Sequence, residues 1–157
     1  MKIDVDKIIE TGIDIKEITL LSIEELNSLQ VPVPTEIIPC WMHHKEDGWW
    51  LRSTHDGYGM TVTNDKDRIV VKKPMSHYCG VRPVLKVDRL SSDLQIGDNV
   101  RIFGYTWTIV SHKLILCDMI VGQTVFKHPR SDDSNSYEIS DIKKWLDKWY
   151  KVKLLMN

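Results

Sequence analysis

The sequence predicts a single α+β domain spanning residues 1–157, in which mixed antiparallel sheets pack against two main helices. Short β-leaning runs separated by turn residues fill most of the chain. A capping box formed by Ser22 and Glu25 predicts the start of one short helix. Apolar side chains at helical spacing from Ile142 to Trp149 predict a longer helix near the end of the sequence.

The composition is that of an ordinary globular protein and excludes some classes of partner. Acidic and basic residues are interspersed and give a net charge of −1, so we expect no concentrated basic face for nucleic acid. No apolar run reaches the ~18 residues that a bilayer crossing requires. The opening residues, Met1 to Asp6, lack the apolar core of a signal peptide. We therefore expect a cytosolic protein that does not enter a membrane.

The first part of the chain is expected to alternate short elements with turns. Residues 5–10 favour a short helix or turn, and residues 15–21 favour a strand. A two-turn helix is expected over 23–29, and the two prolines in Val31–Pro34 end it because proline cannot continue the hydrogen bonds. The bulky aromatic run 49–53 indicates a central strand.

A hairpin and a proline-containing strand are expected next. Residues 54–59 are predicted to be a turn, and 60–63 with 68–71 to be the two strands of a hairpin. Residues 79–87 favour one further strand, and Pro83 within it indicates an edge position or a bulge.

The polar segment 88–99 is expected to join two halves, 1–88 and 99–157, that share one core. Ser140 is the expected cap of the last helix, and residues 119–126 are expected to contain a short strand. Three runs are expected to form a meander: 99–104, 105–110 and 113–117.

Cysteine and tryptophan usage adds two expectations. Cys40, Cys79 and Cys117 are odd in number and have no CxxC spacing, which argues against a disulfide framework or a zinc knuckle. We expect buried free thiols, since reduced cysteine behaves as a small hydrophobic residue. Six tryptophans are many for this length, and we expect most of them in the core.

Two phrases resemble a bacterial domain family of unknown function. Residues 49–53 are WWLRS and residues 80–85 are GVRPVL, similar to the WWLRS and GVRPxL signature of that family. Residues 18–26 are similar to the strand-then-helix phrase that precedes WWLRS there. The family resembles the formylglycine-generating-enzyme and C-type-lectin-like fold, and is common in surface and phage-associated proteins. The resemblance implies a C-type-lectin-like, sulfatase-modifying-factor-like fold for this chain.

The second half resembles the same family in a different order. Residues 103–110 are similar to its opening strands and residues 137–146 to its tryptophan-containing helix, but in the family both precede WWLRS. The resemblance thus covers about residues 15–155 in circularly permuted order, which is feasible where termini lie close together. The alternative is a homodimer in which the halves swap between chains. Two departures are Asp147, an asparagine in the family, and a shorter loop after WWLRS that carries His55.

Candidate binding residues lie in and beside the two signature strands. Strand alternation puts Trp50 and Arg52 on one face and Trp49 on the other, so one tryptophan is core and the other can stack on Arg52 or on a ligand ring. Arg52 and Arg82 either hold an anionic or hydroxylated ligand or tie a carboxylate or carbonyl inside the fold. With loops 54–59 and 72–79, the predicted binding residues are Trp50, Arg52, His55, Asp56, Tyr58, His77, Tyr78 and Arg82.

No catalytic or metal-binding constellation is indicated, and we expect neither a metal nor a cofactor. The neighbours His43 and His44 cannot both point the same way along a strand, and no HxH or HExxH spacing occurs. Residue type alone would allow a metal site to be assembled from six residues, but their spacing does not support one: His43, His44, His55, His77, Asp56 and Cys79. The Ser53–Asp56 segment is too contiguous for a catalytic triad, and Asp132 with Asp133 is expected to be solvated.

Three functional hypotheses follow. The first is a non-catalytic recognition module for a protein partner or a small polar ligand, from a phage or mobile element, that occupies or sequesters a host component. The second is a thiol- or metal-dependent oxidase-like enzyme of the same fold class. The third is a structural subunit of a particle, which predicts a large apolar patch and stable oligomers.

Overall fold

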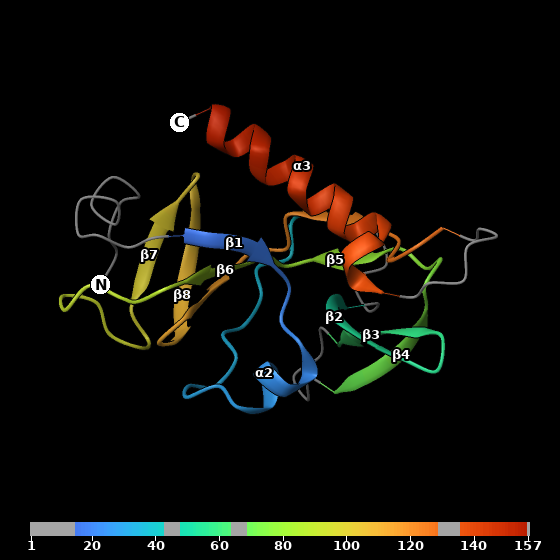
Figure 1. Ribbon diagram of the computed structural model, residues 1–157, viewed down its shortest axis with the longest axis horizontal. Helices are drawn as coiled ribbons and strands as arrows, with labels where there is room; N and C mark the ends of the chain where they lie inside the picture. The colour runs from blue at the N-terminus through green and yellow to red at the C-terminus, as the bar shows by residue number, and fades with distance from the viewer. Residues whose placement is uncertain (1–14, 43–47, 64–68, 129–135, 157) are drawn as a thin grey trace.

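The computed structural model describes residues 15–42, 48–63, 69–128 and 136–156. It confirms the α+β class, with two five-stranded sheets and helices (Figure 1). The helix or turn predicted over residues 5–10 lies outside the described residues.

All neighbouring strands of the first sheet are antiparallel. Its order is β1–β6–β9–β8–β7, and β1 pairs with β6 so that Ile18 lies opposite Leu85. The predicted meander is confirmed, because β7, β8 and β9 follow one another in the chain and pair in that order. The strand bounds are β1 (Ile15–Thr19), β6 (Val84–Val87), β7 (Asn99–Ile102), β8 (Tyr105–Ser111) and β9 (Leu114–Cys117).

The second sheet brings the two signature segments together. Its order is β10–β5–β2–β3–β4, and β2 runs parallel to β5 with Trp49 opposite Gly80, while the other pairs are antiparallel. The strand bounds are β2 (Trp49–His55), β3 (Tyr58–Val62), β4 (Val70–Pro74), β5 (Cys79–Val81) and β10 (Gly122–Thr124). The WWLRS and GVRP segments are therefore neighbours in space.

The β2–β3 connection is tighter than the turn predicted over 54–59. His55 pairs with Tyr58, which leaves Asp56 and Gly57 as a two-residue turn. Their φ angles are 51° and 82°, the left-handed conformation that Asp-Gly adopts readily in such hairpins. The predicted hairpin of 60–63 and 68–71 is formed by β3 and β4, and Arg68 lies outside the described residues.

The single strand predicted over 79–87 is wrong, and so is its edge position. The chain leaves the second sheet after β5 and enters the first at β6, and both strands are flanked on each side. Arg82 and Pro83 make this crossing. Proline has no N–H to give to a ladder, and the crossing needs none, while the Pro83 carbonyl accepts a hydrogen bond from the Cys117 N–H at 2.9 Å.

The helices begin where the sequence predicts. Helix α2 (Ile23–Asn27) has the complete capping box of Ser22 and Glu25. Helix α3 (Asp141–Leu155) is capped by Ser140, follows the 3₁₀ turn η2 (Tyr137–Ile139), and lies along β1 (Figure 1). Its regular hydrogen bonding continues to Leu155.

Two buried clusters occupy the interior. One contains Trp50, Leu85, Trp107 and Leu146, and so combines residues from both 1–88 and 99–157. The other lies on the opposite side of β2 and contains the neighbours of Trp50, namely Trp49 and Leu51, with residues of β6 and β9. Of the six tryptophans, Trp49, Trp50 and Trp107 are fully buried, and Trp41 is 49% exposed.

Candidate functional site

Trp50 belongs to the core, which corrects its prediction as a ligand-binding residue. Its side chain is fully buried, and its indole Nε1–H donates to the Thr124 carbonyl at 2.8 Å. Its ring and that of Phe126 form a T-shaped pair, with ring centroids 5.5 Å apart. With its N–H satisfied and no exposed surface, Trp50 is a packing residue between β2 and the segment after β10.

Arg82 is likewise a structural residue rather than a binding one. It is fully buried, Nε donates to the Cys117 carbonyl at 2.7 Å, and Nη2 donates to the Pro34 carbonyl at 2.8 Å. Its guanidinium carbon lies 5.0 Å from the centroid of the Trp49 ring, a cation–π contact. The alternative that Arg82 ties carbonyls inside the fold is therefore the correct one.

Arg52 fastens helix α2 to strand β2. Its Nη1 donates to the Leu20 carbonyl at 2.6 Å and to the Glu25 carboxylate, with which it forms an ion pair. Next to it, the Ser53 hydroxyl accepts a hydrogen bond from the Ile23 N–H at 2.9 Å. Arg52 is partly exposed, but its described contacts are internal, and they position the Glu25 side chain.

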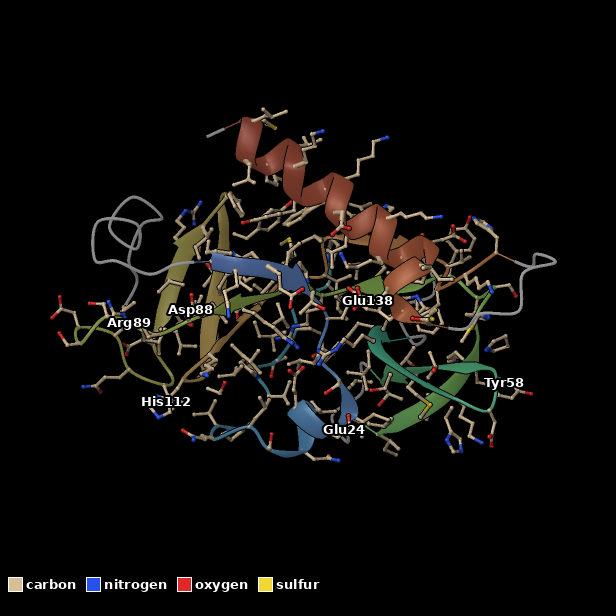
Figure 2. The ribbon with its side chains drawn as sticks, in the orientation of Figure 1. Glu24, Tyr58, Asp88, Arg89, His112 and Glu138 are labelled. Carbon is tan, nitrogen blue, oxygen red and sulfur yellow. The ribbon has the colours of Figure 1, made fainter. Side chains whose placement is uncertain are left out.

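The other five predicted residues are exposed around the β2–β3 turn and the β4–β5 connection. His55 Nε2 lies 3.1 Å from a carboxylate oxygen of Asp56, and Tyr58 sits at the far end of the second sheet (Figure 2). The Lys72 ammonium lies 5.9 Å from the centroid of the Tyr58 ring. Tyr58 and Tyr78 are 45% and 55% exposed. We call this surface the tip; its predicted residues are His55, Asp56, Tyr58, His77 and Tyr78.

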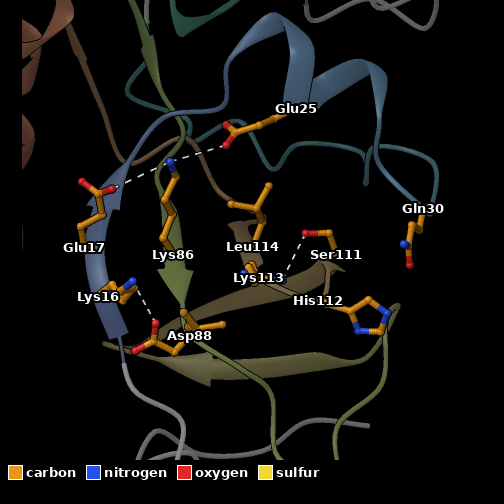
Figure 3. A pocket seen from close by; sticks show the side chains of 11 residues that line it. Lys16, Glu17, Glu25, Gln30, Lys86, Asp88, Ser111, His112, Lys113 and Leu114 are labelled. Atoms are coloured by element: carbon orange, nitrogen blue, oxygen red, sulfur yellow. Dashed lines mark hydrogen bonds and ion pairs between the residues drawn. The ribbon is translucent and has the colours of Figure 1, made fainter.

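A second surface, which the sequence did not predict, is a groove of about 820 Å³ on the first sheet. Strands β6 and β9 supply its floor, and its walls come from β1, from α2 with the residues after it, and from the β8–β9 turn (Figure 3). The groove is lined by Lys16, Glu17, Glu25, Gln30, Lys86, Val87, Asp88, Ser111, His112, Lys113 and Leu114.

Ion pairs connect most of the charged side chains of this groove. The Lys86 ammonium lies between two carboxylates, 3.8 Å from Glu17 and 3.6 Å from Glu25 (Figure 3). The Lys16 ammonium lies 3.0 Å from Asp88. Because Lys86 stands on a central strand and Glu25 is also held by Arg52, these two side chains are preorganised.

Glu25 is ionised within this network. Burial raises the pKa of its carboxyl group, but hydrogen bonds from Arg52 and from the Ser22 N–H, with the charge of Lys86, outweigh burial and leave the pKa below its ordinary value. Its Oε1 accepts from the Ser22 N–H at 3.0 Å. One carboxylate thus caps helix α2 and forms part of the groove wall.

A smaller hollow of about 500 Å³ adjoins the groove. The two share Asp88, His112 and Lys113, so that these residues form the boundary between them. The hollow adds Arg89 and an apolar floor that includes Leu94. Asp88, Arg89 and His112 lie at one end of the molecule, and Tyr58 lies at the other (Figure 2).

The groove cannot be predicted from the sequence pattern because its charged residues are far apart in the chain. Pairing of β1 with β6 brings Lys16 beside Asp88, and only the tertiary fold adds Glu25 and the β8–β9 turn. One signal was present: Lys86 is a lone charge inside the apolar strand Val84–Val87. A charged residue in a central strand requires a polar surrounding, and here that surrounding is the groove.

The cysteines give no support to thiol chemistry at Cys117, and Cys40 departs from the expected burial. Cys79 and Cys117 are buried free thiols, whereas Cys40 is exposed. Burial raises the pKa of the Cys117 thiol to about 12, which keeps it protonated near neutral pH. Within the described residues, no three His, Cys, Asp or Glu side chains are grouped to hold a metal ion. His43, His44, Asp132 and Asp133 lie outside the described residues.

Comparisons of the chain with protein-family models, with curated proteins and with solved structures gave no match. Among the described residues, no helix has the length and apolar character needed to cross a bilayer.

Proposed function

We propose that the protein is a non-catalytic recognition module that binds a small polar ligand in the groove between α2, β1, β6 and the β8–β9 turn. One observation carries this proposal: the groove of about 820 Å³ is lined by five charged side chains that ion pairs connect, namely Lys16, Glu17, Glu25, Lys86 and Asp88. Its volume falls within the range of ~300–1,000 Å³ that is usual for ligand pockets.

The lectin-like architecture with permuted segment order is part of the same proposal. Its support is the adjacency of the two signature segments: Trp49 pairs with Gly80, and the Gly80 N–H donates to the Gly48 carbonyl at 2.8 Å. A setting in the cytosol, in a phage or mobile element that sequesters a host component, is proposed with it. The reduced state of Cys40, Cys79 and Cys117 suits that compartment.

Titration of the ¹⁵N-labelled protein with small polar compounds tests the groove. The panel should contain neutral, anionic, cationic and zwitterionic members, and binding should shift the backbone amides of Lys86, Asp88 and Ser111. Gln30→Trp should weaken binding, because an indole on the rim narrows the groove. Asn27→Trp places the same ring on an exposed position of α2 that does not line the groove, and should leave binding unchanged. Failure of every compound class to shift groove amides contradicts the proposal.

A second candidate function is favoured by the two exposed tyrosines of the tip. Tyrosine is among the residue types that dominate protein interfaces, and Tyr58 and Tyr78 are about half exposed. If the tip binds a protein partner, that partner should co-purify with the protein from a host lysate. The double change Tyr58→Ser with Tyr78→Ser should abolish this co-purification. Ile69→Ser removes a similarly exposed apolar side chain and should have no effect.

A further inference from the structure

Every acidic side chain that lines the groove or the adjoining hollow has a basic partner. Glu17 faces Lys86 at 3.8 Å, Glu25 pairs with Arg52, and Asp88 pairs with Lys16 at 3.0 Å. Within each pair, the positive charge neutralises the negative one, so the negative charges of this surface are already compensated.

The basic side chains are not all used in these pairs. Arg89 and Lys113 form no ion pair with any carboxylate in the part of the chain that the structure describes. Together with His112 they line one hollow, and His112 and Lys113 also line the groove. All three side chains are exposed. Arg89 lines the hollow, while His112 and Lys113 lie where the hollow meets the groove. Arg89 and His112 lie at the same end of the molecule (Figure 2). We call Arg89, His112 and Lys113 the basic corner.

We propose that the ligand of the groove is an anion whose carboxylate or phosphate group binds at the basic corner. This inference rests on the proposed function, and it specifies the ligand class. A guanidinium and an ammonium bind an anionic group through charge-assisted hydrogen bonds, and the imidazole of His112 supplies a further N–H donor.

The body of the ligand lies in the groove beyond the basic corner. The Ser111 hydroxyl and the Gln30 amide line that part of the surface. Both side chains are able to hydrogen-bond to uncharged polar groups of a ligand. Farther along, the Lys86 ammonium between its two carboxylates offers donors and acceptors side by side (Figure 3). A polar, hydroxylated body fits this lining better than an apolar one.

Three compounds with a shared three-carbon polyol body test the charge requirement: glycerol, glycerate and glycerol 3-phosphate. We expect saturable shifts of the Arg89, His112 and Lys113 amides with one or both anions, and none with glycerol at the same concentration. The two anions distinguish a carboxylate ligand from a phosphate ligand. The double change Arg89→Gln with Lys113→Gln should weaken anion binding roughly fivefold or more, since each exposed charge contact is modest. Raised salt should weaken it as well.

Lys148→Gln is the matched control, because Lys148 is an exposed lysine on α3 and lines neither cavity. Equal binding of glycerol and the anions, or equal loss of affinity in the Lys148→Gln variant, overturns the anionic assignment. If neutral or cationic compounds alone shift the groove amides, the proposed function stands and this inference fails. If no class of compound shifts them, the proposed function itself fails.

Discussion

Trp145 of α3 occupies the space beside Gly122 of β10 where any larger side chain would lie. A Cβ atom placed on Gly122 would come within 2.3 Å of the indole ring. The last helix and the edge strand β10 of the second sheet therefore approach each other closely only because position 122 has no side chain.

Gly122→Ala should destabilise the fold by about 1–3 kcal/mol, the usual range for overpacking. The measurement is the free energy of unfolding in urea. In a Trp145→Leu background the ring is gone, and the same glycine change should be neutral or slightly stabilising. An equal penalty in both backgrounds would show that the contact is not responsible.

Arg82→Met should destabilise the protein far more than the same substitution at an exposed arginine. The methionine keeps much of the apolar stem but removes the donors to the Cys117 and Pro34 carbonyls inside the fold. We expect a loss of about 3 kcal/mol or more in unfolding free energy, since an unsatisfied buried polar group costs ~1–3 kcal/mol. Arg101→Met, at an exposed position of β7, should change it by less than about 0.5 kcal/mol.

The lowered pKa of Glu25 predicts an acid-dependent loss of stability. Because the folded-state pKa lies below the ordinary value of 4.5, ionised Glu25 stabilises the fold at neutral pH. That contribution falls as the pH drops below the ordinary value and through the folded-state pKa. Glu25→Gln should lower stability by about 1 kcal/mol at neutral pH. Urea midpoints of the two proteins should converge toward acid pH, and a constant difference would refute the linkage.

Alkylation should distinguish the exposed cysteine from the two buried ones. A maleimide should label the native protein once, at Cys40, because Cys79 and Cys117 have no accessible surface. The Cys117 thiol is also protonated, and only the thiolate is reactive. All three should react in denaturant, and intact mass spectrometry counts the adducts. Rapid labelling of Cys117 in the native protein would instead support a chemical role for its thiol.

Local signals in the sequence were sufficient for the elements whose hydrogen bonds are local. The capping box at Ser22, the Ser140 cap and the β7–β9 meander all form as predicted. Each depends on residues close in the chain, where side-chain chemistry and turn geometry act directly. The sequence also predicts a turn around Asp56–Gly57, although the paired strands extend farther into it than predicted.

Features that depend on distant contacts could not be derived in the same way. The split of residues 79–87 between two sheets follows from the burial of Arg82 against carbonyls of Pro34 and Cys117, segments far away in sequence. The burial of both Trp49 and Trp50 follows from the second cluster, because a strand with cores on both sides has no exposed face. The groove exists only once β1 and β6 have paired.

The route of the chain between the sheets has a consequence during synthesis. In chain order, β1 of the first sheet is followed by β2 to β5, which are four of the five strands of the second sheet, and only then by β6, which pairs with β1. A nascent polypeptide must therefore carry β1 without its partner strand until the ribosome has released β6, because the ladder joins residues 15–19 to residues 84–87. Translation that pauses just before β6 should leave a chain prone to association through that open edge, and so dependent on chaperones.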